Sequence, residues 1–170
     1  MAQAENSKML IYKRILLWSL VILGMGVIGF LSSQTAPESN GLSGRTIRAL
    51  LPLFMPDFPA MSWAEQSEIV SGLQSVVRDA AHVLTYFLLG ILCMAALLTY
   101  EWKMKNRIAA ALLIGAGYAA LDELHQMFVS GRAFELYDIG LDCSGLLLGI
   151  LIAVVLHRLT IRVKTYAEEG

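Results

Sequence analysis

Four long apolar segments constrain the fold of this chain more than any other feature of its sequence. They cover residues 15–31, 80–99, 108–129 and 139–156, and a helix needs about 20 apolar residues to cross the hydrocarbon core. The third segment is short for a span unless its polar end lies in the interface or faces protein. Only 16% of the residues are charged, against about 25% in a typical soluble domain. We therefore predict an all-α membrane bundle of four transmembrane helices, forming a single domain over residues 1–170.

The remaining composition excludes several classes of protein. The formal net charge is −1 and no basic stripe with interleaved aromatic residues is present, so we expect no nucleic-acid partner. Cys93 and Cys143 both lie in apolar segments, which predicts buried thiols rather than a disulfide framework. The first segment lacks an Ala-x-Ala cleavage site and continues as Ser32-Ser33-Gln34. We therefore interpret it as a spanning helix rather than a signal peptide.

The distribution of Lys and Arg predicts the orientation of the spans, because basic residues concentrate on the cytoplasmic side of membrane proteins. Nine of the thirteen basic residues lie before the first span, between the second and third, or after the fourth: Lys8, Lys13, Arg14, Lys103, Lys105, Arg107, Arg158, Arg162 and Lys164. The opposite side keeps Arg45, Arg48, Arg78 and Arg132. We therefore expect both termini to be cytoplasmic, which requires an even number of spans.

The extracytoplasmic segment 35–78 contains recognisable helix signals. Residues 42–54 carry a short apolar pattern that either lies flat on the membrane or packs over the bundle. Pro56 and Pro59 interrupt this pattern. Ser62 and Glu65 then have the spacing of a helix capping box. We expect the helix that they begin to run through Arg78 into the second span.

Polar residues gather where the predicted spans reach the outer leaflet. Four clusters meet there: residues 32–34, Arg78 with His82, residues 122–126, and Asp138 with Asp142. A carboxylate at the centre of a membrane helix costs roughly 2.5–3.5 kcal/mol, so such groups need a partner or a function. This convergence predicts a polar site in the outer leaflet.

Helical spacing divides the clusters into faces, since residues three or four positions apart lie on one side of a helix. The residues that share faces are Arg78, His82 and Tyr86; Asp122, His125 and Gln126; and Asp138 and Asp142. The last face continues into Gly145 and Gly149, whose small size allows close approach to another membrane helix. Glu123 points roughly 100° away from Asp122, so we expect it to have a separate role.

Three interpretations of these residues remain open. The first is a structural network in which Arg78 or Arg132 pairs with Asp122, Asp138 or Asp142. The second is a metal site with the candidate ligands Asp122, His125, His82 and Asp138; Asp-x-x-His is weak evidence, so we assign no metal and name no cofactor. In the third, the arginines hold a phosphate or carboxylate while histidine and carboxylates move protons.

Ser32, Ser33 and Ser39 lie close to the same cluster. A serine hydroxyl acts as a nucleophile only when a base lies beside it. We favour the alternative, in which these hydroxyls form hydrogen bonds at helix ends.

The polar residues also form an ordered pattern along residues 14–157: Ser32-Ser33-Gln34, Glu38-Ser39-Asn40, Ser43, Arg78, His82, Asp122-Glu123-x-His125-Gln126, Arg132, Asp138, Asp142 and Gly145. This pattern resembles the VanZ-like family of bacterial membrane proteins. Asp79 and Thr85 depart from it, because the family commonly has a basic residue at the first position and often glutamate at the second. The resemblance implies a multi-pass protein of the bacterial cell membrane with an envelope role. The family takes its name from an accessory protein linked to low-level teicoplanin resistance.

Our leading hypothesis is a protein that binds or acts on an envelope lipid or ligand in the outer leaflet. Lower sensitivity to glycopeptides such as teicoplanin would be its consequence, and whether the site is catalytic is left open. The candidate partners are membrane lipids, a lipid-linked envelope precursor and a glycopeptide. The residues assigned to proton transfer are Asp122, Glu123, His125 and Asp138. Those assigned to binding are Ser33, Gln34, Arg78, His82, Gln126, Arg132 and Asp142, the last of which orients a neighbour.

The competing hypothesis is non-enzymatic: the same residues form a structural core, and the protein is an accessory or scaffold for other envelope proteins. A transporter is a weaker third hypothesis, because four spans are few for one chain.

Overall fold

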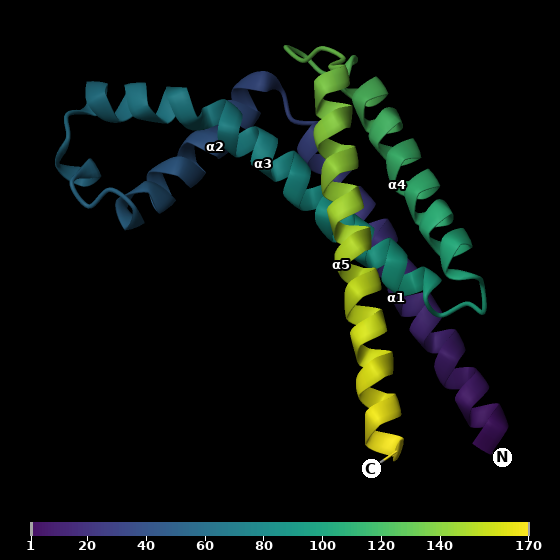
Figure 1. The fold of residues 1–170 in the computed structure, drawn as a ribbon. Helices are drawn as coiled ribbons and strands as arrows, with labels where there is room; N and C mark the ends of the chain where they lie inside the picture. Colours follow the sequence, from purple (N-terminus) through teal and green to yellow (C-terminus); the bar gives the residue numbers. More distant parts are fainter. Residues whose placement is uncertain (1, 170) are drawn as a thin grey trace.

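The structure is a computed structural model that describes the backbone of residues 2–169 and the side chains of residues 3 and 5–163. The side chain of Lys164, one of the basic residues expected on the cytoplasmic side, falls outside this range. Every regular element in the described range is a helix, and Figure 1 shows their arrangement. In chain order they are α1 (Ala2–Ser32), α2 (Ala36–Leu50), η1 (Leu51–Leu53), η2 (Phe58–Ala60), α3 (Trp63–Leu97), α4 (Met104–Gln126) and α5 (Leu136–Glu169).

Helices α1, α3, α4 and α5 are long and apolar enough to cross a membrane, which confirms the predicted all-α bundle with four spans. Three of them extend well beyond the apolar segments, because the helical backbone continues into the flanking polar sequence. Helix α4 instead ends at Gln126, three residues before the end of the third segment. The residues that follow form a turn that leads to Gly131, whose φ of 76° favours glycine.

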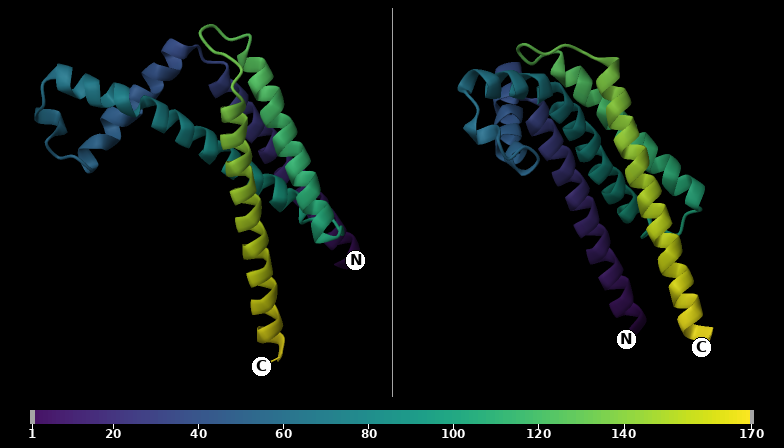
Figure 2. Two further views of the ribbon diagram at one scale, coloured as in Figure 1. Left: turned by 45° about the horizontal axis from the view of Figure 1, so that its top comes forward. Right: turned by 60° about the vertical axis from the view of Figure 1, so that its left-hand side comes forward.

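Helix α3 begins at the predicted capping box and runs without interruption into the second span. The Ser62 N–H donates to the Glu65 carboxylate at 2.8 Å, and the Ser62 hydroxyl oxygen accepts from the Glu65 N–H. Its 35 residues are about 52 Å long at about 1.5 Å per residue, well over the thickness of the hydrocarbon core. The first half of α3 therefore projects sideways from the bundle, as Figures 1 and 2 show.

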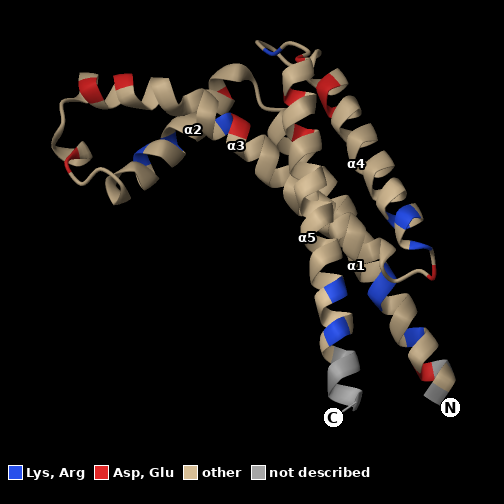
Figure 3. Cartoon of the chain, viewed as in Figure 1, with Lys and Arg blue, Asp and Glu red and all other residues tan. Residues whose placement is uncertain are grey.

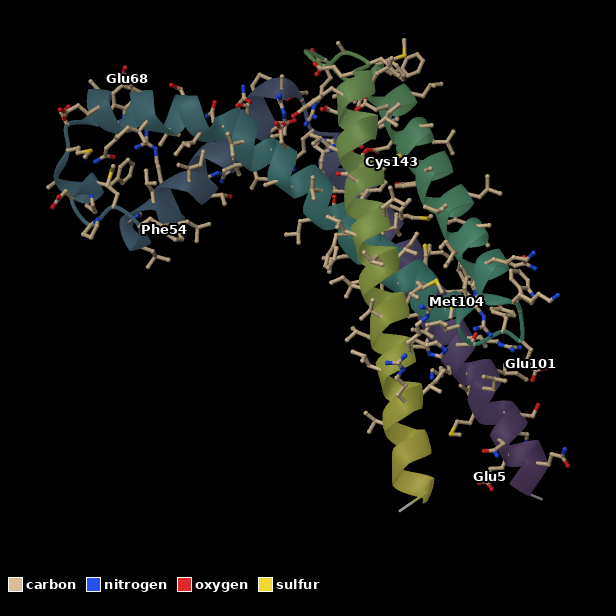
Figure 4. The ribbon with its side chains drawn as sticks, viewed as in Figure 1. Glu5, Phe54, Glu68, Glu101, Met104 and Cys143 are labelled. Carbon is tan, nitrogen blue, oxygen red and sulfur yellow. The ribbon has the colours of Figure 1, made fainter. Side chains whose placement is uncertain are left out.

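Helix α2 packs against this projecting half of α3, and the two form a lateral hairpin over residues 36–77. A small apolar core of Ile47, Phe58 and Val70 holds the hairpin together. The apolar pattern of residues 42–54 therefore contributes to the hairpin rather than covering the bundle. At the tip, Leu53 and Phe54 remain 76% and 83% exposed, and Phe54 is labelled there in Figure 4. Whether the hairpin lies on the membrane stays a prediction.

The largest interface in the bundle joins α3 to α5. A Cβ atom added at Gly145 would clash with the backbone of Val83, and one added at Gly149 would clash with the backbone of Phe87. These two glycines therefore allow the close helix approach predicted from their spacing.

Charged residues are divided between the two ends of the bundle (Figure 3). Acidic residues gather at the end of α4 and the start of α5, whereas most Lys and Arg of the spans lie toward the opposite end, where both termini are found. We call the acidic region, formed by the end of α1, the end of α4 and the start of α5, the polar end. Termini at one end agree with an even number of spans, and their cytoplasmic location stays a prediction.

Substitution of Gly149 tests the close packing of α3 and α5. We expect Gly149→Ala to lower the free energy of unfolding by about 1–3 kcal/mol, because the new methyl group overpacks the interface. Gly140→Ala is the matched control, since Gly140 lies in the same helix with open space around its Cα. Unfolding by SDS in mixed micelles, followed by circular dichroism, measures both variants. Equal stability of the two would contradict the packing described here.

Cysteine accessibility tests the orientation. In a chain with Cys93→Ala and Cys143→Ala, we expect Ser130→Cys, in the exposed loop after α4, to react with a membrane-impermeant maleimide on intact cells. Glu101→Cys, in the exposed loop before α4 that Figure 4 labels, should react only after the membrane is permeabilised. The reverse pattern would invert the predicted topology.

Candidate functional site

The close contact of α3 and α5 brings His82 against two carboxylates. His82 Nδ1 lies 2.9 Å from Asp142 Oδ1, and His82 Nε2 lies 3.9 Å from Asp138 Oδ2. Asp142 is completely buried, which explains why a carboxylate one turn inside the span needs a partner. When Asp142 is ionised it only accepts, so Nδ1 carries the hydrogen and Asp142 orients the ring. The predicted orienting role of Asp142 therefore has a geometric basis, with His82 as the oriented group.

A second pair of contacts joins the ends of α1 and α4. The Ser32 hydroxyl donates to Asp122 at 2.7 Å, and both residues are buried. Ser33 Oγ lies 3.2 Å from Nε2 of His125 but donates its hydrogen to the carbonyl of Gly29 at 2.6 Å. Because a hydroxyl has one hydrogen, His125 acts as the donor in this arrangement and does not take a proton from Ser33. The expected helix-end hydrogen bond is thus present at Ser33, whereas Ser32 supports Asp122.

Glu123 faces away from Asp122, as the helical spacing indicates, and lies in neither of the cavities described below. Its side chain is only 1% exposed. The carboxylate accepts a hydrogen bond of 2.8 Å from the backbone N–H of Glu135, just before α5 begins. This contact fixes the α4–α5 connection and supports a structural contribution of Glu123 distinct from that of Asp122.

The loop between α4 and α5 returns across the end of α1. The backbone N–H of Ala36 donates to the carbonyl of Ser130. Arg132 donates from Nε to the carbonyl of Gln34 at 3.2 Å and from Nη1 to Gln126 Oε1 at 3.0 Å. The guanidinium of Arg132 therefore joins three predicted binding residues, which come from α4, the α1–α2 connection and the α4–α5 loop.

Two cavities of about 200 Å³ each lie beside these residues. The first, which we call the apolar cavity, is formed mainly by α1, α2 and α3, with Asp122 of α4 and Arg132 of the α4–α5 loop. Its largely apolar walls carry polar groups: Ser32, His82, Tyr86 and Asp122. The second, which we call the polar cavity, lies under the α4–α5 loop and includes Gln126, Glu135 and Asp138. Ser39, Arg78 and Arg132 line both cavities.

Buried polar atoms without a protein partner concentrate at this site. Within the described part of the chain there are seven such side-chain atoms, and five belong to residues of the site: Arg78 Nε, Tyr86 OH, Glu123 Oε1, Gln126 Nε2 and Asp142 Oδ2. Buried polar groups in native proteins are nearly always hydrogen-bonded. Their concentration therefore singles out this region from the rest of the bundle.

The predicted site residues do not all meet. Seven of them line a cavity: Gln34, Arg78, His82, Asp122, Gln126, Arg132 and Asp138. Asp142 contacts one of these seven. Ser33 and His125 are exposed and line neither cavity, and Glu123 is buried elsewhere. Their catalytic and binding roles stay predictions.

The residues of this region that lie outside the predicted set include Ser32, Ser39, Tyr86 and Glu135. The position of Tyr86, four residues after His82, was a signal for its place in the cavity wall. Glu135 lines the polar cavity and contacts Glu123 through its backbone N–H. The sequence carried no signal for this contact, because every residue except proline has a backbone N–H.

Two earlier interpretations can be compared with this geometry. Among the described side chains, the contacts within 4.0 Å between a basic nitrogen and a carboxylate oxygen at this site both involve His82. Neither Arg78 nor Arg132 therefore forms the predicted ion pair with an aspartate. No group of three or more His, Cys, Asp or Glu side chains in the described residues is arranged to hold a metal ion. Both cysteines are free thiols.

The family profile described as VanZ/LLP1 matches residues 17–157. The chain belongs to the VanZ/LLP1 family. The match covers most of the chain, including the greater part of each of the four spans. Every residue that lines the two cavities lies within it. No curated protein and no solved structure matches the chain significantly. Membership of the VanZ/LLP1 family therefore confirms the resemblance found in the sequence, and the site has to be interpreted from its own geometry.

Replacement of the two histidines tests which one belongs to the buried network. We expect His82→Ala to lower the free energy of unfolding by about 3 kcal/mol, because it leaves the buried Asp142 carboxylate without its partner. His125→Ala should change it by less than about 0.5 kcal/mol, since His125 is exposed. SDS unfolding in mixed micelles measures both. A larger effect of His125→Ala would show that the histidine assignments are reversed.

Proposed function

We propose that this protein binds an amphipathic lipid or lipid-linked ligand of the bacterial cell envelope in the apolar cavity, at the outer face of the membrane. The observation that carries the proposal is the composition of that cavity. Side chains such as Ile28, Leu31 and Val77 form apolar walls, and ionisable groups lie beside them. Ligand sites typically combine apolar walls with a few placed polar groups, which fix the orientation of the ligand.

The proposal includes a consequence for the cell. Sequestration or modification of an envelope lipid would change the surface on which glycopeptide antibiotics act, and we propose reduced sensitivity to teicoplanin as the outcome. The polar end lies on the outer side in the predicted topology, which supports access to that surface. Membership of the VanZ/LLP1 family supports the envelope role.

His82 is the group best placed for proton transfer, if the bound ligand undergoes chemistry. It lines the cavity, and Asp142 orients its ring through Nδ1. An aspartate that fixes one histidine nitrogen leaves the other available as an acid or base. Asp122 lines the same cavity and is held by Ser32. These two residues, rather than His125, carry the catalytic part of the proposal.

The second candidate function is a non-enzymatic accessory or scaffold protein. It is supported by the same hydrogen bonds, because Ser32–Asp122 joins α1 to α4 and His82–Asp142 joins α3 to α5. Under this alternative the polar end stabilises the bundle, and the apolar cavity has no specific ligand.

Glycopeptide susceptibility distinguishes the two functions. We expect the wild-type chain to reduce teicoplanin sensitivity of a susceptible Gram-positive host, and Ala81→Trp to abolish that protection by filling the apolar cavity that Ala81 lines. Asp122→Asn should also lose protection, although its amide oxygen still accepts from Ser32. Minimal inhibitory concentrations of teicoplanin and vancomycin, at matched membrane abundance, measure the effect.

Two variants serve as controls in the same host. Ala80→Trp introduces the same side chain at an exposed neighbour that does not line the cavity, and His125→Ala removes an exposed histidine. Both should protect as the wild type does. Protection that survives Ala81→Trp and Asp122→Asn would favour the scaffold function. Susceptibility of the wild type equal to the empty vector would reject the link to glycopeptides.

A further inference from the structure

Arg78 and Arg132, together with Ser39, line both cavities. Arg78 comes from α3, one turn before His82, and Arg132 comes from the α4–α5 loop. A molecule that occupied both cavities would therefore pass between or beside two guanidinium groups. The two guanidinium groups therefore lie at the boundary between the apolar cavity and the polar cavity.

The two guanidinium groups are not neutralised by a close carboxylate. Within the described side chains, no Asp or Glu lies within 4.0 Å of either one. Arg78 forms no hydrogen bond with a described residue, and its Nε atom is buried without a partner. Arg132 uses Nε and Nη1 for neutral oxygens, a backbone carbonyl and an amide. Both positive charges thus remain available to an anion.

The electrostatic surroundings of Arg132 support this view. Burial lowers the pKa of its guanidinium, and the positive charge of Arg78 lowers that pKa further, while more distant carboxylates oppose the change. A guanidinium nevertheless stays protonated at physiological pH. The two cations therefore repel each other in a partly desolvated place, and a shared anion would relieve that repulsion. Guanidinium groups bind phosphate with two parallel hydrogen bonds, which suits this role.

The polar cavity limits the charge of the anion. Glu135 and Asp138 line it beside the same arginines. Their carboxylates would repel a second negative charge and would accept hydrogen bonds from hydroxyl or ammonium groups. A singly charged phosphodiester with a donor-rich polar substituent fits these constraints better than a phosphate monoester, which carries more negative charge.

We propose that the ligand is a phosphodiester lipid, with its phosphate between Arg78 and Arg132, its apolar chain in the apolar cavity and its hydroxyl- or amine-bearing head group in the polar cavity. This inference rests on the proposed function, because it names the chemical class of the amphiphile bound at the same site. It adds the requirement for a single phosphate charge and the direction in which the molecule lies.

Lipid retention by the purified full-length chain tests the inference. The probes are dioctanoyl phosphatidylglycerol, its phosphate-free analogue dioctanoylglycerol, dioctanoyl phosphatidic acid and inorganic phosphate, each added to the protein in neutral detergent micelles. Native mass spectrometry measures the bound fraction. We expect phosphatidylglycerol to saturate at one molecule per chain, and the other three probes to bind roughly tenfold more weakly or worse.

Variants of the two arginines provide the matched comparison. Arg78→Gln and Arg132→Gln should each weaken phosphatidylglycerol binding by roughly tenfold or more, and Arg132→Lys should fall between them and the wild type because lysine keeps only the charge. Arg45→Gln is the control, since Arg45 is an exposed arginine on α2 that lines neither cavity. Thermal unfolding checks that each variant remains folded.

The outcomes separate this inference from the proposed function. Equal binding of phosphatidylglycerol and dioctanoylglycerol, unchanged by either glutamine variant but lost in Ala81→Trp, would overturn the phosphate site and leave an amphiphile in the apolar cavity. Binding that neither the arginine variants nor Ala81→Trp affects would identify annular lipid and overturn both. Inorganic phosphate as strong as the lipid would remove the role of the apolar chain. Stronger binding of phosphatidic acid would overturn the limit to one negative charge.

Discussion

At Gly145 and Gly149, helix α5 lies so near to α3 that no side chain fits between their backbones. The rest of the site depends on this approach. It sets the rotation of both helices, so that His82 meets Asp142 and comes close to Asp138. Association of helices in lipid relies on packing rather than on hydrophobic burial, which makes such backbone contact the main source of order. The packing seam and the polar contacts lie on one face of α5, so each reinforces the other.

Carboxylates and guanidinium groups at the polar end have different kinds of hydrogen-bond partner. Three of the four buried carboxylates among the described residues accept a hydrogen bond: Asp122 from Ser32, Glu123 from the backbone N–H of Glu135, and Asp142 from His82. The fourth, Asp138, lies 3.9 Å from His82. Arg132 donates only to neutral oxygens. Arg78 forms no hydrogen bond with a described residue, and its Nε atom is buried without a partner. The bundle thus provides internal donors for three of its buried carboxylates and leaves the positive charge of two arginines at the boundary between the two cavities. A structural salt-bridge network would have paired the two kinds of charge directly.

Local patterns in the sequence predicted the elements well. Hydropathy located the spans, and the Ser62–Glu65 spacing marked the start of α3, because both signals depend on neighbouring residues alone. Thr35 and Glu38 carry the same spacing before α2, where Glu38 accepts from the Thr35 N–H, so that signal was available and was not used. The roles of the histidines were harder to assign. His125 shares a helix side with buried residues, yet the rotation of α4 leaves it exposed, and only tertiary packing determines such a rotation. The cavities, likewise, are formed by residues from several helices and the α4–α5 loop.

The uninterrupted course of α3 has a mechanical consequence. The helix contains no proline between Trp63 and Leu97, so the lateral hairpin and the cavity wall carried by Arg78 belong to one continuous helix. Phe54 and Trp63 are exposed at the far end of the hairpin, and exposed Trp and Phe side chains favour the membrane–water interface. Because the hairpin and the bundle share helix α3, a tilt of the bundle would change the depth of the hairpin tip relative to the membrane surface. If the tip does settle there, residues such as Phe54 and Trp63, which do not line the apolar cavity, would set the depth at which that cavity meets the lipid.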